Sequence, residues 1–251
     1  MKKEKIYFAS DFHLGSPNYE ESLKREKKII SWLNEIEKDA KKIYLLGDIF
    51  DFWFEYEKVV PKGFVRLLAK LADLVDKGIQ IHFLVGNHDM WMRDYLEKEI
   101  GLKVHFKEFI IEEDNQLIFI GHGDGLGKGD YKYKILKSLF NSKICKWLFS
   151  RLHPNFGIGL GQAWSNKSRK EQENLKNEEK EILVGYCKEQ QKNNPVDYYV
   201  FGHRHIPMEV KIDERANYIN LGDWIHHYSY AVLSNKKLEL KSIYIKIIII
   251  K

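Results

Sequence analysis

Five short clusters in the sequence bring together side chains that bind metal ions and carry protons. In Asp-x-His and His-x-His the two side chains are two residues apart, so on extended backbone they project to the same side and reach one cation or two adjacent ones. Their carboxylates, imidazoles and one asparagine carbonyl suit manganese, iron or zinc. In chain order the clusters are Asp11-Phe12-His13, Gly47-Asp48-Ile49-Phe50-Asp51, Gly86-Asn87-His88-Asp89, Gly121-His122-Gly123-Asp124 and Gly202-His203-Arg204-His205.

The chemistry that such a ligand set performs is hydrolysis of phosphoesters. A carboxylate such as that of Asp48 can bridge two cations about 3.5 to 4 Å apart, the separation at which a shared hydroxide and a phosphoryl group can be held. Taken singly, each cluster also has a plainer explanation, because a buried histidine is often structural and Gly-Asp after a strand often forms a turn. The presence of all five in one chain favours a two-metal site.

Strands and helices alternate around the first three clusters. Apolar runs at 5–10, 42–46 and 79–85 predict buried strands, and a cluster follows each of them. Helical spacing of apolar residues at 20–39, and again from Pro61 to Gly78, predicts the intervening helices. This βαβαβ pattern predicts parallel strands that present the clusters at their ends.

The sequence after these strands is β-rich apart from one long insertion. Two apolar runs, 109–111 and 117–120, flank Asp114-Asn115 and predict a hairpin, and Asn235-Lys236 predicts another turn. We therefore expect an α/β fold, a β-sandwich of two mixed sheets flanked by helices. The 251 residues, of which 44% are hydrophobic, are enough for a single domain, 1–251, around one core.

The insertion, 126–192, differs in composition from the rest of the chain and predicts a helical cap. Its first part, 128–151, interleaves basic and apolar residues like an amphipathic helix, and glycines at 157–161 predict a link to a second helix at 165–192. Two roles stay open: a packed helical hairpin with a solvated basic face, or a surface that binds an anionic or lipidic substrate. The basic residues of the first part are Lys128, Lys132, Lys134, Lys137, Lys143, Lys146 and Arg151.

Composition and charge limit the partners and the cellular compartment that we expect for the protein. A net charge of +5 permits an anionic substrate or membrane surface, without the dense basic stripe typical of nucleic-acid binding. The only two cysteines, Cys145 and Cys187, argue against a disulfide framework and fit a reducing compartment. Asp11 and His13 interrupt the apolar start of the chain too early for a signal peptide, so we expect a cytoplasmic protein. The isoleucine-rich run 242–250 is shorter than the ~20 residues of a spanning helix and predicts a closing strand, with membrane contact as the alternative.

In order and number the clusters resemble those of the calcineurin-like metallophosphoesterases, and the resemblance extends from Ile6 to Trp224. The resemblance implies two divalent cations bridged by Asp48, with manganese favoured and iron or zinc as alternatives. It also implies that His88 is the non-ligand histidine that assists the leaving group or stabilises the transition state, and that Asp89 orients it. A hydroxide shared by the cations would attack phosphorus without a covalent intermediate. The implied ligands are Asp11, His13, Asp48 and His205 for the first cation and Asp48, Asn87, His122 and His203 for the second.

A branch of that family, the UDP-2,3-diacylglucosamine hydrolases of lipid A biosynthesis, gives a narrower resemblance. It extends over 10–15, 47–53, 121–124 and 221–224 and includes the helical insertion. These enzymes cleave a pyrophosphate to UMP and 2,3-diacylglucosamine 1-phosphate. The resemblance therefore implies a lipidic nucleotide-sugar substrate and peripheral contact with the cytoplasmic face of the inner membrane. The residues that it assigns to substrate binding are Asn87, Ser165, Asn166 and Lys167.

His88 departs from that narrower pattern, because the typical enzyme has arginine there, a permanent fork-shaped cation. The substrate can therefore be another phosphomonoester or phosphodiester. A nuclease would use the same metals, but the basic residues gather on one predicted helix instead of running between aromatic stacking positions, so nucleic acid is not the expected partner. A non-catalytic scaffold would have lost metal ligands, whereas all seven implied ligand positions are filled here.

Overall fold

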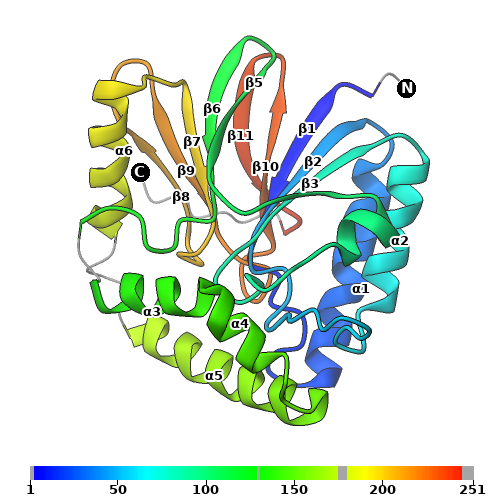
Figure 1. Ribbon diagram of the computed structural model, residues 1–251. Coiled ribbons are helices and arrows are strands. Elements are labelled where there is room, and N and C mark those ends of the chain that lie inside the picture. The colour runs from blue at the N-terminus through cyan, green and yellow to red at the C-terminus, as the bar shows by residue number, and fades with distance from the viewer. Residues whose placement is uncertain (1–2, 129–130, 175–179, 245–251) are drawn as a thin grey trace.

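The computed structural model describes residues 3–128, 131–174 and 180–244, which form two β-sheets packed face to face with helices outside them (Figure 1). The strand order is β11-β10-β1-β2-β3-β4 in the first sheet and β5-β6-β7-β9-β8 in the second. The first sheet contains β1 (Lys5–Ala9), β2 (Ala40–Leu46), β3 (Gln80–Leu84), β4 (Lys103–His105), β10 (Ser229–Ser234) and β11 (Lys237–Ser242). The second contains β5 (Phe109–Glu113), β6 (Gln116–Ile120), β7 (Tyr198–Phe201), β8 (Pro207–Lys211) and β9 (Asn217–Leu221).

Parallel pairing joins β1 to β2, β2 to β3 and β3 to β4, which confirms the predicted βαβαβ arrangement. Side chains of a strand alternate between its two faces. On β1, Ile6 and Phe8 therefore pack between the two sheets, whereas Tyr7 and Ala9 pack on the outer side. The same alternation buries both faces of the central strands, so their sequences are almost continuously apolar.

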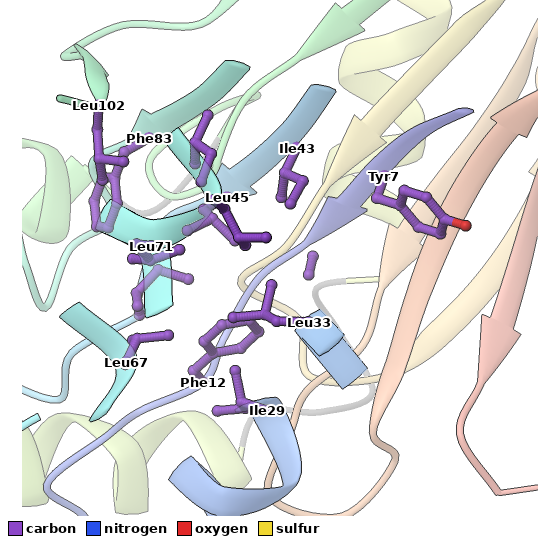
Figure 2. Packing of buried hydrophobic residues seen from close by; sticks show 14 of the residues in the cluster. Tyr7, Phe12, Ile29, Leu33, Ile43, Leu45, Leu67, Leu71, Phe83 and Leu102 are labelled. Carbon is purple, nitrogen blue, oxygen red and sulfur yellow. The ribbon is translucent and has the colours of Figure 1, made fainter. Parts of the chain in front are cut away.

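Two helices, α1 (Tyr19–Ile36) and α2 (Val65–Asp76), cover the outer face of the first sheet (Figure 1). Figure 2 shows part of this packing, in which Leu33 of α1 and Leu71 of α2 belong to the same buried cluster as Leu45 of β2. The predicted start of the second helix at Pro61 is wrong. Gly63 and Phe64 have φ angles of +115° and +56°, so helical backbone begins only at Val65. A short π-helical turn, η1 (Leu96–Ile100), precedes β4.

The second sheet is also mixed, because β6, β7 and β9 are parallel while β5 and β8 are antiparallel to their neighbours. Asp114 and Asn115 have φ angles of +52° and +60° between β5 and β6, and this left-handed pair closes the predicted hairpin. The predicted turn at Asn235-Lys236 joins β10 to β11 in the same way. The expected fold of two mixed sheets flanked by helices is confirmed.

The described residues of the insertion form four helices instead of the two expected. The predicted helix 128–151 is interrupted at Ser142, whose hydroxyl accepts a hydrogen bond from the N–H of Cys145 and so starts a new helix. The predicted link at 157–161 is helical: a Cβ at Gly161 would lie 2.2 Å from the ring of Phe52, so this glycine lets the helix pack closely. The helices are α3 (Tyr131–Asn141), α4 (Lys143–Phe149), α5 (Pro154–Asn174) and α6 (Lys180–Asn193).

These helices occupy two places. α3, α4 and α5 gather beyond one end of the sheets, whereas α6 lies along the outer side of the second sheet (Figure 1). Leu183 and Cys187 of α6 pack there with Tyr199 and Phe201 of β7. A functional cap built from the insertion would therefore consist of α3, α4 and α5.

Membrane insertion through a helix finds no support in the part of the chain that the structure describes. No helix within it combines the length and the apolar character needed to cross a bilayer. The isoleucine-rich run predicted as a closing strand falls at 245–250 outside the described residues, and β11 ends at Ser242.

Candidate metal centre

The five clusters occupy the loops that follow β1, β2, β3, β6 and β7, and an unusual backbone conformation marks them. Five of the seven predicted ligands have left-handed backbone, with φ angles between +43° and +67°. Such a conformation costs a non-glycine residue of order 1–2 kcal/mol and persists where the surrounding structure enforces it, which is common at functional sites. The five are Asp11, His13, Asp48, His203 and His205.

Asp11, His13 and His205 form one group of converging side chains, with one ligand atom from each lying within 4.8 Å of the others. The Nε2 atoms of the two histidines are 2.9 Å apart, and His205 Nε2 lies 3.2 Å from Asp11 Oδ1. Asp11 and His13 are fully buried. These residues come from loops 192 positions apart in the sequence, so only the fold brings them together.

A second group consists of Asp48, His122 and His203, whose ligand atoms also lie within 4.8 Å of one another. His122 Nε2 is 3.2 Å from Asp48 Oδ2 and 3.2 Å from Asn87 Oδ1. The same Asp48 oxygen lies 3.7 Å from His13 Nε2 in the first group. Asp48 therefore stands between the two groups, in the place of a bridging carboxylate.

The donor atoms fit two divalent cations. The Nδ1–H of His122 donates to the carbonyl of Leu46 at 2.7 Å, so loss of a proton from the ring would leave the Nε2 lone pair toward Asp48. His203 Nδ1 is buried and has no hydrogen-bond partner among the described residues. His13 Nδ1 lies 3.3 Å from Asp51 Oδ1, a carboxylate placed to hold a metal-binding histidine. Imidazole nitrogens and carboxylate oxygens that converge in this way suit hard or borderline metal ions.

Charge is unevenly distributed over the centre. Burial disfavours the charged forms of Asp48 and His122, but their attraction outweighs it: the imidazoles of His122 and His88 keep the pKa of the Asp48 carboxyl below its ordinary value, and Asp48 raises the pKa of His122 to about 10. At His203 burial dominates and lowers the pKa to about 4. Since a ligating imidazole must be unprotonated, binding of a cation near His122 requires release of a proton.

His88 lies at the border of the centre, where it forms a third group of converging side chains with His13 and Asp51. Its Nε2 is buried, 3.9 Å from Asp48 Oδ2. Its Nδ1 lies 3.0 Å from the carbonyl of Asp51 and 2.5 Å from the hydroxyl of Ser165. Among the described contacts, Asp51 and Ser165 therefore take the orienting role that was predicted for Asp89.

Asp89 instead connects two loops through hydrogen bonds. Its fully buried carboxylate accepts hydrogen bonds from the backbone N–H of Gly86 at 2.7 Å and of Ile49 at 2.8 Å. Gly86 permits this close approach, because a Cβ there would lie 2.2 Å from Asp48 Oδ1. The loops after β2 and β3 are thereby held in register around the Asp48 carboxylate.

Arg25 is a positioning residue that the sequence reasoning missed. It is buried on α1, and its guanidinium donates to the carbonyls of Phe12 and His13 at 3.1 Å and to that of Ser16 at 2.5 Å. These bonds hold the loop that carries two predicted ligands. The available signal was an arginine on the same helical face as apolar residues such as Ile29.

Asp223 and Asp124 support the centre from its two sides. Asp223 Oδ2 lies 3.9 Å from His205 Nδ1, and its other oxygen accepts from the N–H of His226 at 2.8 Å. Asp124 accepts from the hydroxyl of Tyr133 and pairs with Lys137, both at 2.6 Å. The loop of the fourth cluster is thus tied to α3, one of the helices of the insertion.

A cavity of about 400 Å³ opens next to the centre and shares Asn87 and His88 with it. Ser165, predicted to bind substrate, lies in its wall and is buried. Asn166 is exposed on the same helix, and the side chain of Lys167 lies outside the described part of the structure. The apolar side chains of the wall include Phe52, Met90, Trp91, Leu136, Phe140, Phe149, Leu160 and Trp164.

Known proteins are similar to this chain over most of its length. Residues 4–207 match the family model for calcineurin-like phosphoesterases. A UDP-2,3-diacylglucosamine hydrolase of Porphyromonas gingivalis is 39% identical over 96% of this chain and 98% of its own length. An enzyme of the same name from Actinobacillus succinogenes is 25% identical over 88% of this chain and 92% of its own. Among solved structures, Yfce, a phosphoesterase from E. coli, covers 95% of this chain and 92% of its own, with 16% identity and a TM-score of 0.47.

Proposed function

The chain belongs to the calcineurin-like phosphoesterase family, and we propose that it hydrolyses the pyrophosphate of UDP-2,3-diacylglucosamine to UMP and 2,3-diacylglucosamine 1-phosphate. Membership makes it a metal-dependent hydrolase. One observation carries the choice of substrate: the apolar cavity and the metal centre share Asn87 and His88. A molecule with a phosphoryl group at the centre and an acyl chain in the cavity would occupy both at once.

The seven predicted ligands would hold two divalent cations. Asp11, His13, Asp48 and His205 would hold one of them, and Asp48, Asn87, His122 and His203 the other. We favour manganese, because the set combines carboxylate and amide oxygens with imidazoles and contains no thiolate. When bound, two such ions supply Lewis-acid stabilisation of phosphoryl oxygens and make water more acidic.

The protein's own residues would guide the remaining chemistry. His88 presents Nε2 to the centre while its Nδ1 is engaged by Asp51 and Ser165, so in the imidazolium form, with a hydrogen on each nitrogen, the proton at Nε2 could pass to the departing phosphate oxygen. Asn87, which borders both the centre and the cavity, would contact the phosphoryl group. The aromatic wall of the cavity would exclude water from an acyl chain, which gains about 0.8 kcal/mol per buried methylene group.

The direct test is to supply the protein with UDP-2,3-diacylglucosamine and measure release of UMP in the presence of manganese, zinc or iron(II). We expect UMP with manganese and loss of turnover after treatment with a chelator, restored when the ion returns. Bis(4-nitrophenyl) phosphate serves as a substrate without acyl chains. Hydrolysis of this ester together with no UMP release would reject the lipid substrate and leave the phosphoesterase intact.

Leu136→Trp should weaken the use of a diacyl substrate selectively. The larger side chain would fill part of the cavity wall, so we expect the KM for UDP-2,3-diacylglucosamine to rise about tenfold through the loss of apolar contact. Turnover of bis(4-nitrophenyl) phosphate should stay within about twofold. Leu139→Trp is the matched control on the same helix, because Leu139 is 55% exposed. If the two variants have equal effects on both substrates, the cavity does not bind the acyl chains of the substrate.

Helices of the insertion also present the features of a membrane-contacting surface, and we include contact with an anionic membrane in the proposal. Ile144 and Trp147 on α4 are 74% and 55% exposed, and Phe156 on α5 is 63% exposed. Lys143 and Arg151 flank them on the exposed surface. Apolar side chains beside basic ones are typical of helices that lie at a bilayer surface.

Trp147→Asp should reduce binding to phosphatidylglycerol vesicles about tenfold in a sedimentation assay, because it puts a charge where a ring would enter the headgroup region. Binding of the unmodified protein should also fall as salt is raised. Val65→Asp is the control, since Val65 is 69% exposed on α2, far from these helices in the sequence. Unchanged sedimentation of the Trp147 variant would contradict this surface.

A further inference from the structure

We infer that Ser165 is a positioning residue that makes the orientation of His88 depend on the seating of helix α5. This inference rests on the proposed role of His88 in hydrolysis. It departs from the prediction that Ser165 contacts substrate. Its hydroxyl is buried and already engaged with two groups of the α/β core.

The contacts of Ser165 join three segments that are far apart in the chain. Its Oγ donates to the carbonyl of Asp51 at 2.6 Å and lies 2.5 Å from Nδ1 of His88. Asp51 follows β2, His88 follows β3, and Ser165 lies within α5. In the described structure, this hydroxyl is the contact through which a helix of the insertion reaches the side chain of His88.

The position of each hydrogen follows from the chemistry of the three groups. The carbonyl of Asp51 can only accept, and the hydroxyl of Ser165 donates its single proton to it at 2.6 Å. With that proton committed, the oxygen of Ser165 accepts from Nδ1 of His88, which then carries a hydrogen whether or not Nε2 is also protonated. The ring is locked in the form that turns Nε2 toward Asp48, where a phosphoryl group would react.

Ser165 lies on α5, the helix that also forms part of the cavity wall. One turn earlier, Gly161 packs against the ring of Phe52, the neighbour of Asp51, and Leu160 and Trp164 line the cavity wall. An acyl chain that occupies the cavity would contact the same helix whose serine holds His88. The position of α5 against the core therefore determines the orientation of the His88 ring. Ser165 thus connects the helix that lines the cavity to the histidine beside the metal centre.

Ser165→Ala should lower kcat for UDP-2,3-diacylglucosamine about tenfold, the size of effect expected from an outer hydrogen-bond partner, while KM stays within about twofold. Ser165→Thr should recover most of the rate because it keeps the hydroxyl. Gln162→Ala, an exposed change on the same helix, should leave the rate unchanged. A fall confined to KM would overturn the inference and return Ser165 to direct substrate binding.

The decisive measurement is a double-mutant cycle with His88→Ala. If Ser165 acts through His88, Ser165→Ala should have less than about a twofold effect in a chain that already lacks the imidazole. If the loss of rate in the double variant equals the product of the losses in the two single variants, the inference is overturned, because Ser165 then acts independently of His88. The cycle is also run on bis(4-nitrophenyl) phosphate. Should the unmodified protein release no UMP, the lipid substrate fails, and the cycle on this ester still decides the role of Ser165.

Discussion

Replacement of Asp48 by alanine is expected to lower kcat/KM for phosphoester hydrolysis by about 10³-fold or more, since it removes several kcal/mol of transition-state stabilisation supplied by the ions. The reason is its position: one carboxylate oxygen lies 3.2 Å from His122 Nε2 and 3.7 Å from His13 Nε2. Without it neither group of ligands is complete. Elemental analysis of the purified protein should show the metal content falling from about two ions per chain to one or none.

Asp73→Ala provides the control for this variant. Asp73 is a carboxylate on α2 that pairs with Lys70 and Lys77 on the surface, so its loss should change neither metal content nor turnover. An Asp48 variant that keeps both ions and loses less than tenfold in rate would show that the two groups of ligands do not share this carboxylate.

Gly86→Ala is expected to disable the centre although it removes no ligand. A Cβ at this position would lie 2.2 Å from Asp48 Oδ1 and 2.6 Å from the backbone nitrogen of Asp48, and neither atom can move freely. Relief of the clash must displace the Asp48 carboxylate, so we expect loss of bound metal and of activity. Overpacking of this kind should also lower the free energy of unfolding by about 1–3 kcal/mol, measured by denaturant titration.

Gly159→Ala is the matched comparison, because no atom would lie within 4 Å of a Cβ at that position on α5. The change there should raise stability by up to about 1 kcal/mol, since alanine is the better helix former. Both variants add one methyl group to a glycine. If they prove equally stable and equally active, close approach at Gly86 is not what holds Asp48 in place.

Much of the fold could be predicted because its central strands obey simple alternation. Ile6 and Phe8 face one side and Tyr7 and Ala9 the other, which gives the continuous apolar run that predicted a buried parallel strand. The clusters could be placed for the same reason: a polar cluster directly after such a run must lie at a sheet edge. The candidate metal ligands could therefore be predicted from the order and the residue types of the clusters.

The rest depended on contacts between distant segments, which a sequence does not display. The cavity and the hold on His88 arise only when α5 meets the loop at Asp51, 114 residues away from Ser165. The glycines of α5 suggested a link because glycine usually breaks helices, whereas Gly161 serves close packing against Phe52. The partners of Arg25 are likewise backbone carbonyls of a neighbouring loop, which the helical pattern around Arg25 does not identify.

The left-handed backbone at five of the predicted ligands would make the abundance of the protein depend on its ion supply. That conformation makes the ion-free fold less stable, whereas an ion that binds only the folded chain adds about 2.7 kcal/mol at a concentration one hundred times its Kd. When the ion is scarce, a larger fraction of molecules is unfolded at any moment and exposed to proteases. Ion starvation would therefore lower the number of protein molecules as well as the occupancy of each one.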